Sequence, residues 1–259
     1  MSLHELKKRE RAEQRTDERA RLRFMASLAE QSARWEECVE FVREVCSLGV
    51  ELTVAERNLL STGYKNLVRK RRESRRVLRH IDAQDGSRQF SNVVGAYTGK
   101  IEEQLEVICT EVIALVERDL LPHSRDVENR VFYLKLVGDH FRYLSEFQQD
   151  EVKLGSTRRA LAAYKNAQEI VDGGQLDPAN PVSLGLALNY SVFLYEILAD
   201  HAAAKRLAER SVKRCLQRLD EMESAGSGAG ADVDSSRHES EQVVRLLQDN
   251  VQLWERSGI

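Results

Sequence analysis

Residues 128–144, which read ENRVFYLKLVGDHFRYL, carry more information than any other stretch of this chain. Lys135 and Arg142 are seven positions apart, so on a helix they share one face, with Tyr143 beside Arg142. The apolar run at 131–134 makes this helix too hydrophobic to be wholly exposed to solvent. The stretch therefore predicts a packed helix that presents two cations and a phenol.

The composition predicts an all-α fold. Only 3 Pro and 14 Gly interrupt 259 residues, and Glu, Arg, Ala and Leu are abundant. Charged residues make up 31% and aromatic residues 6%, as is typical of long amphipathic helices with wide solvated faces. The net charge of −3 is nearly balanced, although residues 69–79 include seven cations.

The lack of a recognisable targeting signal and the pattern of cysteines predict a cytoplasmic protein without a membrane partner. No run approaches the roughly 20 apolar residues of a membrane span, and residues 1–23 lack the apolar segment of a secretory signal. The four cysteines lack the spacing of metal-binding pairs and lie within helical patterns, which predicts small buried hydrophobic residues of a reducing compartment: Cys38, Cys46, Cys109 and Cys215.

Periodicity and breaker residues predict nine helices. Their expected ranges are 17–32, 35–48, 54–82, 91–120, 127–148, 152–171, 181–199, 202–223 and 237–256. Residues 1–16 are polar and basic and are either a frayed helix or disordered, so we expect a flexible extension before one domain at 17–256 and a short tail at 257–259. Residues 224–236, rich in Ser, Gly and Ala, predict a flexible loop, and the single helix after it must pack back onto the domain.

The last helix carries two apolar stripes. One stripe comprises Val244, Leu247, Val251 and Trp254, and the second, about 100° away, comprises Val243, Leu246 and Asn250. We expect one stripe to face the core and the other to line a groove.

The third helix carries a straight basic stripe. Its members follow one another at spacings of four, three, four and three: Lys65, Arg69, Arg72, Arg76 and Arg79. From the residues alone this stripe is either a solvated helix face or a patch that attracts phosphate groups, including those of nucleic acid.

Four segments in this order resemble the signature segments of the 14-3-3 family, the all-helical dimers that clamp phosphoserine and phosphothreonine peptides. They are residues 57–66, 128–144, 184–196 and 246–254. The resemblance implies nine antiparallel helices that form a cup with an amphipathic groove. It also implies an adaptor that clamps phosphorylated client proteins in signalling and works as a homo- or heterodimer.

The resemblance assigns the phosphate to Lys65, Arg72, Arg142 and Tyr143. A phosphoserine carries about −1.5 to −2 charges and three acceptor oxygens at pH 7. Two guanidinium groups provide bidentate, charge-assisted hydrogen bonds to it, and the phenol adds a neutral donor. Asp139 and Glu146, at i−3 and i+4 from Arg142, are placed to hold that side chain.

The remaining groove positions also follow from the resemblance. Leu188, Val192, Val243 and Leu246 match apolar positions that face peptide side chains. Asn189 and Asn250 match asparagines that bond the peptide backbone, for which an amide offers both a donor and an acceptor. Lys135 lines the groove, and Glu196 orients the basic cluster.

The resemblance implies a dimer in which the N-terminal helices of one subunit pack against the fourth helix of its partner. The matching positions are Leu28, Ser32, Arg34, Glu37, Ser74, Tyr97 and Lys100. Glu37 and Lys100 are expected to form an ion pair between subunits, whereas Gln104 stands where an acid usually faces the Arg34 position.

Several residues depart from the family pattern. Arg69 and Lys70 replace small residues between the phosphate-binding positions, and Arg75 replaces a common tryptophan. Gln242 stands where a groove leucine is usual.

Catalysis has no support in the sequence. The six histidines are scattered, and there is no Ser-His-Asp set and no glycine-rich phosphate loop, so we expect no enzyme activity, metal or cofactor. The alternative is a helical-repeat interaction scaffold that does not depend on phosphate, although the 34-residue self-similarity of such repeats is absent. A nucleic-acid binder ranks third, and we expect no nucleic-acid partner.

Overall fold

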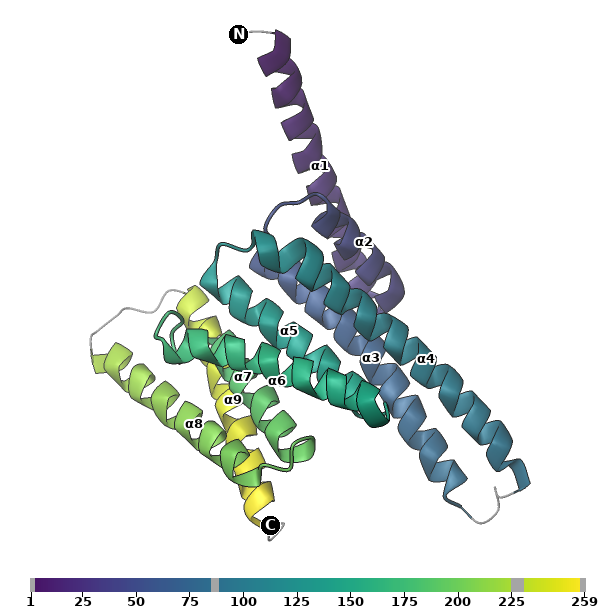
Figure 1. Cartoon of the computed structure of the whole chain (residues 1–259). Coiled ribbons are helices and arrows are strands. Elements are labelled where there is room, and N and C mark those ends of the chain that lie inside the picture. Colours follow the sequence, from purple (N-terminus) through teal and green to yellow (C-terminus); the bar gives the residue numbers. More distant parts are fainter. Residues whose placement is uncertain (1–2, 85–88, 225–230, 257–259) are drawn as a thin grey trace. The chain divides into compact units, whose positions relative to one another are not determined.

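A computed structural model describes residues 3–84, 89–224 and 231–256, and these residues contain nine α-helices and no strand (Figure 1). The expected all-α class is confirmed. The helices are α1 (Leu3–Gln31), α2 (Trp35–Ser47), α3 (Val54–Asp82), α4 (Ser91–Leu115), α5 (Val127–Ser145), α6 (Asp150–Asp172), α7 (Pro181–Glu196), α8 (His201–Ser224) and α9 (Ala231–Arg256). The chain divides into two compact units, one ending at His123 and the other beginning at Ser124.

The first unit is built on α3. A capping box starts this helix: Thr53 Oγ1 accepts from the Glu56 N–H at 3.3 Å, and the Glu56 carboxylate accepts from the Thr53 N–H at 2.8 Å. The same buried carboxylate accepts from Arg19 Nε at 2.8 Å, which ties α1 to α3. Helix α4 packs along α3 as its antiparallel neighbour (Figure 1).

The end of the first unit differs from the expected helix at 91–120. Helix α4 stops at Leu115, and a π-helical turn (Val116–Leu120) and a 3-10 turn (Leu121–His123) follow. Pro122 explains the change, because it has no N–H and its ring clashes with the carbonyl four residues earlier. The Leu121 N–H bonds instead to the Val116 carbonyl, five residues back.

The second unit surrounds α5 and α7. Asp126 caps α5 by accepting from the N–H groups of residues 128 and 129, and Asn180 caps α7. Helix α6 packs against α5, and α9 packs against both α7 and α8. A methyl group at Gly138 of α5 would lie 2.7 Å from the Tyr164 ring of α6, so only glycine permits this close approach.

Helix ends differ from the sequence expectation near both termini. Helix α1 begins at Leu3 rather than near residue 17, so residues 3–16 adopt the helical alternative, and their flexibility stays a prediction. Residues 225–230 of the expected loop lie outside the described residues. Helix α9 begins at Ala231 rather than near 237, because extending an existing helix costs far less than starting a new one.

All four cysteines are buried free thiols, as predicted. Burial raises the pKa of Cys38 to about 11, of Cys46 to about 12 and of Cys215 to about 11. None of the described helices combines the length and the hydrophobicity that crossing a bilayer requires.

Candidate functional site

Asp139 on α5 organises the polar face of the second unit. Its buried carboxylate accepts from Lys135 Nζ at 2.8 Å, from the Tyr164 hydroxyl at 2.6 Å, and from Asn189 Nδ2 at 2.8 Å on each oxygen. Burial alone would raise the pKa of this carboxyl, but the charges of Lys135 and Arg142 hold it below its usual value. Helices α5, α6 and α7 are therefore joined by one ionised carboxylate.

Arg142 is a buried and pre-positioned cation. The residue is 7% exposed, and its Nη1 donates to Glu146 at 3.3 Å. Its guanidinium carbon lies 4.5 Å from the centroid of the Tyr143 ring. Burial opposes the charge, but Tyr164, Tyr143 and Asp139 raise the pKa of Arg142 above its ordinary value. Arg142 therefore stays charged, and its Nε–H has no acceptor among the described residues.

The expectation that Asp139 and Glu146 both hold Arg142 is half right. Glu146 bonds to Arg142, whereas Asp139 bonds to Lys135, Tyr164 and Asn189 and acts on Arg142 only through its charge. Helix geometry alone offers Asp139 a partner at either i−4 or i+3. The packing of α5 against α6 and α7 makes Lys135, rather than Arg142, the partner of Asp139.

Lys65 and Arg72 lie on α3 in the first unit. They are seven residues apart, so they share one face at a rise of about 10 Å. Lys65 is exposed and Arg72 is partly exposed. The four phosphate residues expected from the sequence are thus divided between two units: Lys65 and Arg72 in the first, and Arg142 and Tyr143 in the second.

Helices α7 and α9 present an open apolar face in the second unit. Leu188, Val192 and Glu196 recur every four residues on α7, with the first two partly exposed and Glu196 exposed. On α9, Val243 and Asn250 are partly exposed and Leu246 is 51% exposed.

The other stripe of α9 faces the core. Val244, Leu247 and Trp254 are buried, and Trp254 stacks on Tyr195 of α7 with ring centroids 4.6 Å apart. The division of α9 into a buried stripe and a more open stripe is confirmed for these residues. Gln242, which departs from the family pattern, is exposed and bonds to His238.

The residues expected at a dimer interface lie on the surface of the first unit. Leu28, Ser32, Arg34, Ser74, Tyr97 and Lys100 are exposed and Glu37 is half-buried. Arg34 pairs with Glu37 within the chain, so the carboxylate expected to meet Lys100 already has a partner. The Ser74 hydroxyl donates to the Lys70 carbonyl at 3.0 Å.

Sequence reasoning missed several exposed apolar side chains of the first unit. Phe24 on α1 is 63% exposed, and Val93 on α4 is 60% exposed. Val77, Phe90 and Tyr97 are exposed as well. The spacing of 90, 93 and 97 was a readable signal, but the same spacing is typical of a helix face that packs into a core.

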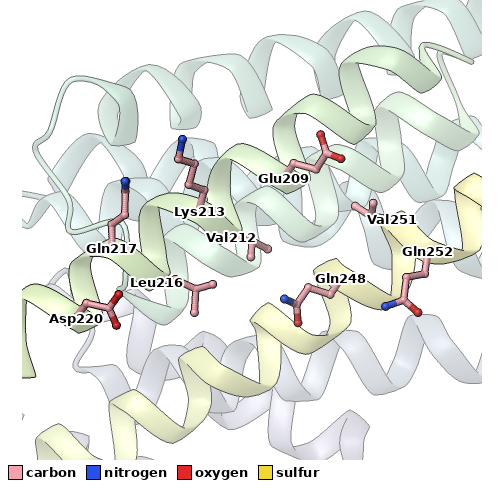
Figure 2. A pocket seen from close by; sticks show the side chains of 9 residues that line it. All are labelled: Glu209, Val212, Lys213, Leu216, Gln217, Asp220, Gln248, Val251 and Gln252. Atoms are coloured by element: carbon pink, nitrogen blue, oxygen red, sulfur yellow. The ribbon is translucent and has the colours of Figure 1, made fainter.

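A shallow groove of about 620 Å³ runs between α8 and α9 (Figure 2). Val212, Leu216 and Val251 form its apolar part, and amide and charged side chains surround them: Glu209, Lys213, Gln217, Asp220, Gln248 and Gln252. None of these nine residues belongs to the site expected from the sequence. Among the described residues, no group of His, Cys, Asp and Glu is arranged to bind a metal.

Comparison with known proteins gives consistent matches across both units. A family profile described as "14-3-3 protein" matches residues 25–255. The 14-3-3 protein 3 of Entamoeba histolytica is 38% identical over 234 residues, covering 89% of this chain and 93% of that protein. The 14-3-3-like protein GF14 omega of Arabidopsis thaliana is 40% identical over 236 residues, 89% of this chain and 87% of that protein. The checkpoint signal transducer rad24 of Schizosaccharomyces pombe is 38% identical over 234 residues, 89% of this chain and 83% of that protein.

Proposed function

The chain belongs to the 14-3-3 family, and from that premise we propose that it binds phosphoserine and phosphothreonine segments of client proteins. Family membership supports a phosphopeptide-binding adaptor in signalling rather than an enzyme. The observation that carries the proposal for this chain is Arg142, a buried cation fixed in place before any ligand arrives. A fixed guanidinium binds an anion without first losing side-chain freedom.

Four side chains would hold the phosphate. Arg142 provides a guanidinium fork, Tyr143 a phenol, and Lys65 and Arg72 two further cations. A dianionic phosphate relieves the repulsion among such cations, whereas an unmodified serine hydroxyl does not. Affinity should therefore depend on phosphorylation of the client.

The peptide backbone and side chains would meet α7 and α9. Asn189 Nδ2 donates to the Asp139 carboxylate, which fixes the amide and leaves its carbonyl oxygen for a ligand. It would accept from a peptide N–H, and Asn250 would supply the matching contact from α9. The four apolar positions would cover peptide side chains: Leu188, Val192, Val243 and Leu246. Lys135 and Glu196 would complete the polar edge.

A dimer is the expected working form of this family. The exposed apolar residues of α1 and α4 in the first unit, including Phe24 and Leu28 on one helix and Val93 and Tyr97 on the other, support a subunit contact there. The choice between a homodimer and a heterodimer depends on which partners match this surface. Four buried cysteines that form no disulfide agree with a cytoplasmic protein.

Calorimetric titration with a phosphoserine peptide and its unphosphorylated copy tests the proposal. The parent should bind only the phosphorylated form. Arg142→Lys keeps the charge but loses the fork, so its affinity should fall at least tenfold, because a charged hydrogen bond is worth about 1.5–3 kcal/mol. Arg210→Lys is the matched control, since Arg210 pairs with Asp172 on the surface of the second unit.

Two results would contradict the assignment. One is equal binding of the phosphorylated and unphosphorylated peptides by the parent. The other is an affinity of Arg142→Lys within a factor of about three of the Arg210→Lys control, with unchanged helical content by circular dichroism.

A further inference from the structure

Helix α3 carries more cations on one face than a single phosphate group requires. Lys65, Arg69, Arg72 and Arg76 follow one another at spacings of four, three and four, all within one continuous helix. They lie within about 40° of a common direction around the helix axis. Arg69 and Arg76 are exposed to solvent.

Two other arginines of this region have acidic partners. Arg71 donates to Glu36 of α2 at 3.3 Å, and Arg75 pairs with Glu102 of α4 at 2.5 Å. The structure thus pairs the cations that face neighbouring helices.

Arg69 and Arg76 are not neutralised in this way. Arg69 donates to the Asn66 carboxamide oxygen at 3.0 Å, and within the described residues neither Arg69 nor Arg76 forms an ion pair. Glu73 is the acid beside this face on α3 itself, and it pairs with neither of them in the described part of the chain. Both cations are therefore available to an external anion.

The charge count indicates a second anionic group on the ligand. One phosphate dianion at Lys65 and Arg72 offsets about two positive charges, and Arg69 and Arg76 add about two more that it leaves unmatched. We propose that Arg69 and Arg76 form a second anion subsite that binds a second phosphate on the same client segment. This inference rests on the proposed function, because it places the first phosphate at Lys65 and Arg72.

Helix and peptide geometry set the spacing of the two phosphates. Arg76 lies four residues beyond Arg72, a rise of about 6 Å along α3. An extended peptide advances about 3.3 Å per residue. The second phosphorylated residue should thus lie two or three positions from the first, on whichever side runs towards Arg76.

The test compares peptides that carry one phosphoserine with peptides that carry a second one two or three positions before or after it. At least one doubly phosphorylated peptide should bind the parent about tenfold more tightly, which is about 1.4 kcal/mol. Arg69→Ala should remove most of that gain and change the affinity for the singly phosphorylated peptide about twofold at most. Lys70→Ala is the matched control, because Lys70 is an exposed cation on a different face of the same helix.

Each other outcome has a distinct meaning. If no second phosphate improves binding, or if Lys70→Ala reduces the gain as much as Arg69→Ala, the subsite is refuted while the proposed function stands. If the parent does not bind the singly phosphorylated peptide at all, the proposed function is refuted instead. Tight binding of a DNA duplex that depends on Arg69 would assign the stripe to nucleic acid and overturn the subsite.

Discussion

Replacing Asp139 by asparagine tests the central polar network of the second unit. The substitution keeps the size of the side chain and removes the charge that Lys135 and Arg142 face. It also places an amide where the Tyr164 hydroxyl and Asn189 both donate, so that some donors would meet another N–H group.

The expected loss of stability is large. Removing one partner of a buried charge pair costs about 3–5 kcal/mol, because the remaining charge is left uncompensated. This is a substantial part of the roughly 5–15 kcal/mol that stabilises an ordinary domain. Phosphopeptide affinity should fall too, since the Asn189 carbonyl and the Lys135 ammonium lose the anchor that orients them.

Urea unfolding followed by circular dichroism measures the effect. Tyr164→Phe is the graded control, because it removes a single donor to the same carboxylate and should cost about 1–3 kcal/mol. The reasoning is refuted if Asp139→Asn loses less stability than Tyr164→Phe. A loss below about 1 kcal/mol would likewise show that the carboxylate is dispensable.

Four further outcomes are expected. Burial lowers the pKa of His140 to about 4, so as the pH falls below about 6.5 the unfolded chain takes up a proton before the folded chain does. The unfolding free energy, measured by urea titration, should therefore decrease as the pH falls from about 6.5 to about 4, and it should decrease less in His140→Gln. Gly138→Ala forces a methyl group against an aromatic ring and should lower the unfolding free energy by about 1–3 kcal/mol, with an unchanged value counting against the close approach. Leu246→Asp should weaken phosphopeptide binding in calorimetry but leave the melting temperature unchanged, because Leu246 is half exposed; parent-like affinity would remove α9 from the groove. Ser74→Glu should raise the monomer fraction in sedimentation experiments while Ser74→Ala behaves as the parent, and equal dimer constants would exclude Ser74 from the interface.

Two helix starts were predicted to the residue. The expected starts at residues 54 and 181 match α3 and α7, which begin at the capping box of Thr53 and Glu56 and at Asn180 followed by Pro181. Both signals act within one turn of helix, so no knowledge of the tertiary fold was needed.

The contacts between helices could not be predicted from the sequence. The Tyr164 hydroxyl reaches Asp139 across 25 positions and Asn189 reaches it across 50, and no periodicity encodes either distance. The exposed Phe24 and Val93 were missed for a related reason, because an apolar stripe looks the same whether it faces a core or a partner. The roles of Lys65, Arg72 and Arg142 at the phosphate stay predictions that the proposed titrations address.

The buried cysteines make the chain a convenient host for chemical labelling. With a pKa of about 11, a thiol such as Cys38 or Cys215 is ionised in roughly one molecule in ten thousand at neutral pH, and burial also blocks access to reagents. A cysteine introduced at an exposed position, for example in place of Lys70 or Lys213, should therefore react with a maleimide dye without first removing the native thiols. One dye in each unit would turn their separation, and its change when a phosphopeptide binds, into a distance that fluorescence energy transfer can follow.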